Sequence, residues 1–295
     1  LEQHAEPPAR VPVEKRPLVD LSVCGSSLLL LPLLGFLIVY NSVLDVGLGI
    51  VGIAVVAFMI FISFQYEKAQ RERIWVMVIL LFFVAIFWMF FELAGSALNV
   101  FTDRFVGRKV DLLFINFEIP TSSFQAVNAL FIMLFAPVFS WMWTALAKWN
   151  LEPNAAIKFA IGLLLLGLGF FALQIGRPFT GSNLLVPAIF LIILYLFHTL
   201  GELAISPVGL SLVTKLAPAK IAGFCMGFWF LSSSIAHQGG KFIGKMTVVD
   251  ETAPAVEAFD KAMQVFNIVG LCGLGSAAVL FALSPMIKKW MHGVK

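Results

Sequence analysis

Charged residues are scarce in this chain, and their scarcity excludes an ordinary soluble domain. Lysine, arginine, aspartate and glutamate make up 13% of the 295 residues, whereas soluble domains carry about 25%. Hydrophobic residues make up 60% of the chain, which has 30 phenylalanines and a mean hydropathy of +0.95. This composition predicts an all-α polytopic membrane protein. The net charge of +3 gives no indication of a nucleic-acid partner, and we expect none.

Cysteine is rare as well, which argues against a cysteine-based framework. The three cysteines, Cys24, Cys225 and Cys272, lie inside apolar runs without metal-ligand spacing. We interpret them as small core residues and expect neither disulfides nor a metal site. A phosphate-binding P-loop pattern is missing too, so we expect no ATP site and no cofactor.

Eight apolar segments are close to the roughly 20 residues that a helix needs to cross a bilayer. They lie near residues 21–40, 46–65, 75–100, 122–147, 156–176, 183–214, 219–245 and 260–287. An even number of spans places both ends of the chain on one side. Thirteen lysines and arginines fall on that side and seven on the other, which predicts cytoplasmic termini.

The first two spans differ from the other six. They contain no charged residue and read as a lipid-facing hairpin, followed by the basic loop EKAQRER. The later spans contain the polar residues that are suited to a functional site. We therefore divide the chain into a polar cytoplasmic segment (1–20), a hairpin with its basic loop (21–74) and a six-helix bundle (75–295).

Glu202 is the only charged residue between positions 183 and 214. A carboxylate at bilayer depth is costly, so such residues usually face a water-filled cavity or an opposite charge. Gly201, Pro207 and Gly209 surround it and loosen the helix where a substrate path needs room. The alternative is a neutral acid that is hydrogen-bonded inside the bundle. We favour a role in transport.

Other polar residues lie at similar depth. Glu92 shares a helix face with Trp88, four residues earlier, although it also fits a carboxylate at a helix end near the outer surface. Gln125 and Asn128 share another face and suit an amide-bearing ligand, or a hydrogen bond between helices. Trp229 lies among small residues, where a tryptophan is more often packing or an interfacial anchor.

Long stretches of this sequence resemble a known family. GELAISPVGLSLVTKLAP, followed by AGFCMGFWFLSSSIAHQGG, is similar to the signature of the proton-dependent oligopeptide transporters of the major facilitator superfamily. FWMFFELAGSALNVFTDR resembles the seventh helix of that family, and FQAVNALFI its eighth. The resemblance implies a six-helix bundle of two inverted three-helix repeats over residues 75–290. The hairpin at 21–65 then corresponds to a two-helix insertion packed outside it.

The same resemblance indicates what this chain lacks. The family's first half carries a helix-1 motif of glutamates, an arginine and tyrosines, and nothing in residues 1–74 matches it. We therefore expect this chain to supply the linker hairpin and the C-terminal half. Its partner is the N-terminal six-helix half of the same transporter.

The resemblance also implies roles for single residues. Glu202 corresponds to a helix-10 carboxylate that pairs with a lysine of the other half at the cytoplasmic gate, near the peptide's amino terminus. Ser206 lies one turn further along the same face. Asn128 corresponds to an amide that binds the peptide backbone, and Trp88 and Trp229 to the walls of side-chain pockets.

Glu92 corresponds to an acid that meets a basic residue of the first half at the outer gate, so gating and proton coupling fall to Glu92 and Glu202. The implied function is symport of di- and tripeptides with protons, in a multi-pass protein of the bacterial inner membrane. The proton gradient drives it by alternating access, with no catalytic residue.

Two other classes of function fit the residues less well. An intramembrane enzyme would use Glu202 and His198, four residues apart, as an acid–base pair, but the sequence offers no nucleophile or metal set beside them. A non-transporting membrane scaffold or receptor is the remaining alternative.

Overall fold

The computed structural model describes residues 16–112, 115–250 and 252–294. The chain divides into two compact units, Leu1–Val51 and Gly52–Lys295. The division predicted from sequence, at 20/21 and 74/75, stays a prediction, and residues 1–15 of its first segment lie outside the described residues.

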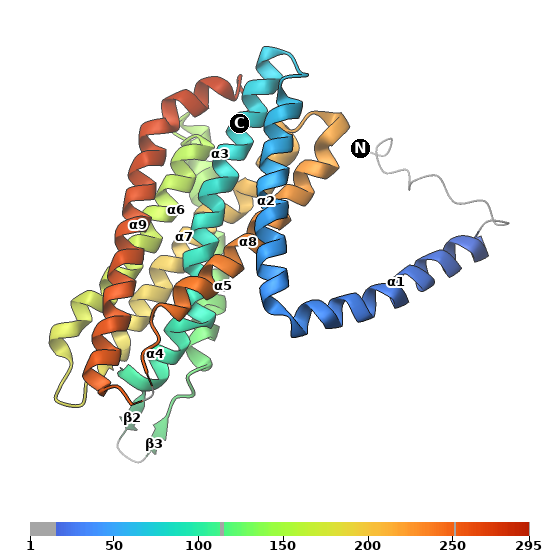
Figure 1. Ribbon diagram of the computed structural model, residues 1–295. Coiled ribbons are helices and arrows are strands. Elements are labelled where there is room, and N and C mark those ends of the chain that lie inside the picture. The colour runs from blue at the N-terminus through green and yellow to red at the C-terminus, as the bar shows by residue number, and fades with distance from the viewer. Residues whose placement is uncertain (1–15, 113–114, 251, 295) are drawn as a thin grey trace. The chain divides into compact units, whose positions relative to one another are not determined.

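The first unit contains one complete helix, and the second is a bundle of long helices (Figure 1). Helix α1 is Arg16–Val39, and α2, Asn41–Ser63, crosses the boundary between the units. The other helices are α3 (Lys68–Phe91), η3 (Glu92–Gly95), α4 (Ala97–Phe105), α5 (Ser123–Lys148), α6 (Ala155–Gly176), η4 (Arg177–Phe179), α7 (Ala188–Leu216), η5 (Ala219–Ile221), α8 (Ala222–Lys245) and α9 (Ala255–Trp290). The short strands are β1 (Val106–Gly107), β2 (Lys109–Leu112), β3 (Ile115–Glu118) and β4 (Val186–Pro187).

The all-α polytopic fold is confirmed. Seven helical segments of the described chain are long and apolar enough to cross a membrane: Ser42–Ser63, Lys68–Phe105, Ser123–Lys148, Ala155–Phe179, Ala188–Leu216, Ala219–Lys245 and Ala255–Trp290. They match seven of the eight expected spans. Helix α1 covers the remaining one, at 21–40.

Helix ends differ from the expected ones where charge or proline decides them. Helix α3 begins at Lys68 rather than near 75, because lysine, glutamine, arginine and glutamate are good helix formers even outside the bilayer. Helix α7 begins at Ala188 rather than near 183. Pro187 directly precedes it with a φ of −57°, and proline favours the start of a helix over its interior.

Helix α6 packs closely against α7 and α9 because glycines face one another at both crossings. A Cβ atom on Gly162 would lie 2.9 Å from the carbonyl oxygen of Gly201 in α7. One on Gly167 would lie 2.8 Å from the carbonyl oxygen of Gly270 in α9. Membrane helices associate through such close backbone packing, since lipid offers no hydrophobic drive.

Aromatic rings connect α4, α6 and α9 inside the same unit. The ring centroid of Phe266 lies 5.4 Å from that of Phe101 and 5.8 Å from that of Phe170. Phe101 also stacks on Phe259 at 5.9 Å. Phe170 and Phe266 are fully buried, and Phe101 and Phe259 are 2% exposed. Such ring pairs stabilise the packing beyond the area that they bury.

The helical segment 68–105 is interrupted at Glu92–Gly95, where α3 gives way to the 3₁₀ helix η3. Ser96, which follows, has φ −124° and ψ −101°, outside the helical region. The sequence ELAGS explains the break, because glycine and serine weaken a helix interior. The break places Glu92 at a turn in the backbone inside the apolar segment.

The end of α9 returns to the start of α3. His292 Nε2 lies 2.6 Å from Glu72 Oε2, and the rings of Trp75 and Trp290 meet edge to face at 5.6 Å. Both ends of the six-helix region therefore lie on one side of the bundle, as an even number of crossings requires. Which side of the membrane this is stays a prediction.

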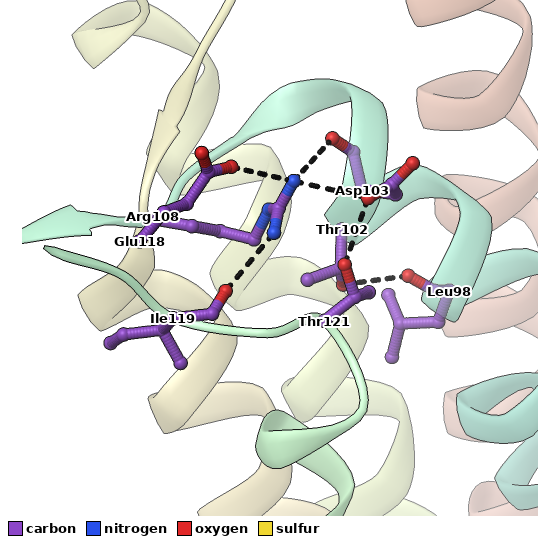
Figure 2. Close-up of polar contacts among 7 residues, drawn as sticks. All are labelled: Leu98, Thr102, Asp103, Arg108, Glu118, Ile119 and Thr121. Carbon is purple, nitrogen blue, oxygen red and sulfur yellow. Dashed lines mark hydrogen bonds and ion pairs between the residues drawn. The ribbon is translucent and has the colours of Figure 1, made fainter.

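At the opposite end, Arg108 fastens the β2–β3 hairpin to the end of α4 (Figure 2). Its guanidinium donates to the Ile119 carbonyl at 3.0 Å and pairs with Asp103 at 3.0 Å and Glu118 at 2.8 Å. Thr121 donates to the same Asp103 carboxylate at 2.9 Å. This cluster organises a loop that no sequence pattern predicted, including strands β2 and β3, which pair antiparallel.

The cysteines have no disulfide partner among the described residues. Cys225 is buried, as predicted, but Cys24 and Cys272 are exposed. The interpretation of all three as core residues is therefore wrong for these two. In a membrane helix the lipid-facing side is as apolar as the core, so an apolar run does not show which way a small residue points. No group of histidine, cysteine or acidic residues in the described ranges is placed to hold a metal ion.

The α6–α9 crossing gives a direct test of the packing. Replacing Gly167 with alanine pushes a methyl group into backbone atoms of Gly270 and Leu274, and we expect a loss of about 1–3 kcal/mol in stability. Gly275→Ala, on α9, is the matched control, because no atom lies within 4 Å of the added Cβ. Thermal unfolding of both variants in detergent measures the difference. Equal unfolding temperatures would contradict this packing.

Candidate functional site

Polar residues from four elements of the second unit meet in its middle. Asn128 lies in the first turns of α5, Glu202 in the middle of α7, Glu92 at the break after α3 and His237 in the second half of α8. Each belongs to a segment that is otherwise apolar enough to cross a membrane. Buried polar groups in such segments require partners.

Asn128 joins α5 to α7. Its amide nitrogen Nδ2 donates to Glu202 Oε2 at 3.1 Å and to Thr199 Oγ1 at 3.0 Å. Thr199 in turn donates its own proton to the Tyr195 carbonyl at 2.7 Å, so its oxygen is oriented to accept from Asn128. Both amide hydrogens of Asn128 are thereby used, which leaves the amide oxygen available to a ligand.

Glu202 is half-buried, and its carboxylate accepts a hydrogen bond from the Asn128 side chain. An amide is neutral, so it does not compensate the charge of a carboxylate. Glu202 has no ion-pair partner within the described part of the chain. A half-buried carboxylate without a counter-ion is suited to bind a cation that arrives from outside this chain.

Glu92 is paired differently. Its Oε1 lies 3.1 Å from His237 Nε2, and the other ring nitrogen of His237 lies 2.7 Å from the Ser233 carbonyl oxygen. The side chains are partly open, with His237 57% and Glu92 32% exposed. The pair connects the break after α3 to α8.

A cavity of about 190 Å³ lies beside Glu92 and Asn128. It is lined by Phe91, Glu92, Ala94, Gly95, Gln125, Asn128, Tyr195 and His198. The lining combines a carboxylate, two amides, a phenol and an imidazole with apolar and small residues. Polar side chains that converge on one cavity make it a candidate small-molecule site.

His198 borders this cavity but does not bond Glu202. Its ring lies between Phe91 at 6.0 Å and Phe170 at 4.8 Å, and it is 1% exposed. Neither ring nitrogen has a hydrogen-bond partner among the residues that the structure describes. The acid–base pair of the enzyme alternative is therefore not assembled.

The other predicted site residues lie in three settings. Trp88 is half-buried, one turn before Glu92, and its ring packs edge to face on Phe91 at 5.3 Å. Ser206 is half-buried, one turn after Glu202, and its buried hydroxyl has no partner in the described ranges. Trp229 is only 9% exposed, so it belongs to the packed interior.

Trp229 fills space between α8 and α7. A Cβ on Gly209 would lie 2.1 Å from Trp229 Cη2, so the indole occupies the space that this glycine leaves on α7. This burial agrees with the packing role that the sequence favoured for a tryptophan among small residues. Its role as a pocket wall stays a prediction.

Two contacts were missed from sequence. Thr199 precedes Glu202 by three residues on the same helix face, and this spacing was the available signal for its part in holding Asn128. His237 shows no pattern with Glu92, because the residues are distant in sequence and their contact depends on how α8 crosses the break. A single histidine inside an apolar span was the only indication.

A larger cavity of about 600 Å³ lies at the end of the bundle that carries the C-terminus. Its lining includes the ion pair of Lys158 and Glu152, at 2.5 Å, and the exposed Lys288. Lys158 also lies 4.6 Å from the ring of Trp143. Its buried charge is already paired, whereas Glu202, which is hydrogen-bonded to Asn128 of the central cavity, has no ion-pair partner among the described residues.

Comparison with known proteins agrees with this geometry. The profile of the POT family (PTR2) matches residues 38–261. The "Uncharacterized transporter YclF" of Bacillus subtilis is 35% identical over 84% of this chain and 47% of its own length. The "Peptide transporter YePEPT" of Yersinia enterocolitica subsp. palearctica is 35% identical over 80% of this chain and 44% of its own.

A solved structure, the peptide transporter POT in complex with sulfate, superposes with a TM-score of 0.72 at 30% identity. It covers 96% of this chain and 55% of the solved chain, so the present chain spans about half the length of its relatives. These relatives are transporters and not enzymes, which removes the enzyme alternative. The family resemblance predicted from sequence is confirmed: this multi-pass membrane protein belongs to the POT family.

Proposed function

We propose that this chain forms the C-terminal half of a symporter that carries di- and tripeptides together with protons. The observation that carries the proposal is Glu202, a half-buried carboxylate in a membrane-spanning helix that is held by the Asn128 amide and has no described counter-ion. Membership of the POT family supports it, as does the similarity to a peptide transporter of Yersinia.

The chemistry of a peptide fits this pair. A di- or tripeptide carries an ammonium group at one end, and Glu202 supplies the negative charge that the ammonium needs once it has left water. The free amide oxygen of Asn128 accepts a hydrogen bond from a backbone N–H of the same ligand. Trp88, Ser206 and Trp229 are the proposed neighbours that surround the peptide's side chains.

The other end of the peptide requires a second half. A peptide carboxylate needs cations, and the central cavity is lined by one acid and no lysine or arginine among the described residues. The N-terminal six-helix half therefore supplies the positive subsite. Binding between two bundles at the membrane midplane is the arrangement that alternating access requires.

The energy comes from protons. Glu92 and Glu202 are the proposed coupling and gating groups, because protonation removes the charge that holds an ion pair between the halves. A proton that moves down the membrane potential contributes about 2.3 kcal/mol per 100 mV. That contribution is sufficient to concentrate a substrate without any cofactor.

We place the protein in the inner membrane of a bacterium with cytoplasmic termini, on the distribution of lysine and arginine. Residues 1–20 form a cytoplasmic segment, 21–74 a linker hairpin with its basic loop, and 75–295 the transporting bundle. The scaffold alternative has no observation in its favour, since a scaffold has no need of uncompensated acids at depth.

Glu202→Gln tests the central assignment. In the complete transporter, reconstituted in proteoliposomes, we expect proton-driven accumulation of dipeptide to fall at least tenfold, because the amide keeps the shape but neither titrates nor forms an ion pair. Glu257→Gln, at the exposed start of α9, is the matched control and should leave accumulation unchanged. Wild-type accumulation by the Glu202 variant would disprove the assignment.

Asn128→Ala tests recognition separately from coupling. Removing the amide takes away a hydrogen bond to the ligand and leaves Glu202 without its donor, at a cost of about 1–3 kcal/mol. We therefore expect peptide affinity to fall about 5- to 150-fold, measured by calorimetry or by competition for uptake. Gln264→Ala, an exposed amide on α9, should leave the affinity as it is. Unchanged affinity in the Asn128 variant would count against a peptide contact there.

The half-site itself makes a further prediction. Residues 1–295 alone should neither accumulate dipeptide nor bind it tightly, because they provide the ammonium-recognising part of the site without cations for the carboxylate. Co-production with the N-terminal half should restore uptake. Uptake by this segment alone, in membranes shown to contain no longer transporter, would overturn the two-half arrangement.

A further inference from the structure

Each ring nitrogen of His237 faces a hydrogen-bond acceptor, and these acceptors determine where the ring carries its protons. Nδ1 lies 2.7 Å from the Ser233 carbonyl oxygen, and a carbonyl oxygen has no hydrogen to donate. Nδ1 therefore carries the proton of that hydrogen bond. Nε2 lies 3.1 Å from the Glu92 carboxylate, which is also an acceptor when it is ionised.

A neutral imidazole has one N–H, and the Ser233 carbonyl already uses it. The contact with Glu92 consequently needs one more proton between the two side chains. We propose that Glu92 and His237 form a shared proton site within this half of the transporter, with imidazolium and carboxylate as its loaded form. The inference rests on the proposed proton-coupled transport for its use, and on the geometry alone for its existence.

The ionic form of the pair follows from its surroundings. Both side chains are partly open, His237 over 57% and Glu92 over 32% of its surface. Glu92 also lines the central cavity, so this bundle does not enclose its carboxylate. A charge-assisted hydrogen bond in such a setting is stronger than a neutral one.

Other titratable groups around the pair come from each neighbouring element. Helix α8 carries Lys241, one turn after His237, and α7 carries Glu202 and His198, the second of which lines the cavity beside Glu92. Asp103 and Arg104 of α4 lie about three helical turns beyond Glu92. Helix α5 presents only uncharged amides to the cavity. None of these groups occupies the space between Glu92 and His237.

The backbones of α8 and η3 lie close together at Glu92 and His237, so the contact between these side chains depends on how the two helices pack. A Cβ on Gly240 would lie 2.9 Å from the Met89 carbonyl oxygen and 3.5 Å from the Cβ of Glu92. Helix α8 thus lies directly against the break between α3 and η3. When the proton leaves, two acceptors face each other at this crossing, and the attraction that links α8 to η3 is lost.

This arrangement gives His237 a definite place in the reaction. It is a positioning residue that determines, through Glu92, how tightly this half retains its proton. Proton release changes the contact between η3 and α8. This contact lies close to Ser96, whose backbone is not helical. The proton is thereby linked to the local shape of the proposed gate.

The direct test measures the histidine ring. The complete transporter, labelled with ¹⁵N-histidine in lipid nanodiscs, is compared with its Glu92→Gln variant at one pH of about 6.5, where an isolated imidazole is half protonated. The His237 signals are assigned from their absence in His237→Gln. We expect the imidazolium fraction of His237 to fall at least twofold in Glu92→Gln, because the glutamine amide donates to Nε2 and makes the second proton unnecessary.

The functional test is a pH profile. In His237→Gln, the glutamine still donates to Glu92 but holds no proton, so the pH of half-maximal accumulation should move toward acid by about one unit. Peptide exchange without a proton gradient should persist. His292→Gln is the matched control, because His292 also contacts a glutamate, Glu72, at 2.6 Å on the opposite end of the bundle. Its pH profile should stay that of the wild type.

The two tests separate the possible failures. An imidazolium fraction that is equal in wild type and Glu92→Gln overturns the shared proton site. A shift in the ring without a shift in the pH profile overturns its role in coupling. If the wild-type protein accumulates no peptide, the proposed function fails, while the ring measurement still decides whether the pair shares a proton.

Discussion

The cost of placing a carboxylate inside a membrane-spanning bundle governs the rest of this structure. Glu92 and Glu202 both lie in segments that are otherwise apolar, and neither is removed from water for packing alone. The chain meets the cost in two ways. Glu202 takes a neutral amide donor from another helix, and Glu92 takes an imidazole that can itself carry charge. This difference is the basis on which we propose one acid for the ligand and the other for a proton.

Backbone geometry makes both solutions possible. Glycines at the α6 crossings bring α7 and α9 against α6, which fixes the position of α7 and hence of Glu202. On the other side of the cavity, the helix from Lys68 breaks at η3, which turns Glu92 toward α8. Gly240 lets α8 approach that break closely. Small residues thus determine where the acids point, although they contribute no chemistry of their own.

Much of this was predictable from sequence, and the limits have physical causes. Length and hydropathy predicted the membrane-spanning helices, since a bilayer imposes a nearly constant length on an apolar segment. Glu92 and Glu202 were recognisable as candidate site residues because a carboxylate inside an apolar segment is costly. The direction of Trp229, Cys24 and Cys272 was not predictable, because lipid and core are equally apolar. The Glu92–His237 contact depends on a crossing between distant segments, which no local period encodes.

The charges of the site also explain why half a transporter suits this chemistry. Glu92 is the acid that lines the central cavity, and Glu202 is hydrogen-bonded to Asn128 of the same lining. In the transporter that we propose, a second bundle supplies positive groups. These groups pair with the same carboxylates once the ligand's ammonium or the proton has left. On this proposal, the exchange of partners at the two carboxylates lets a site at the membrane midplane load on one side and empty on the other.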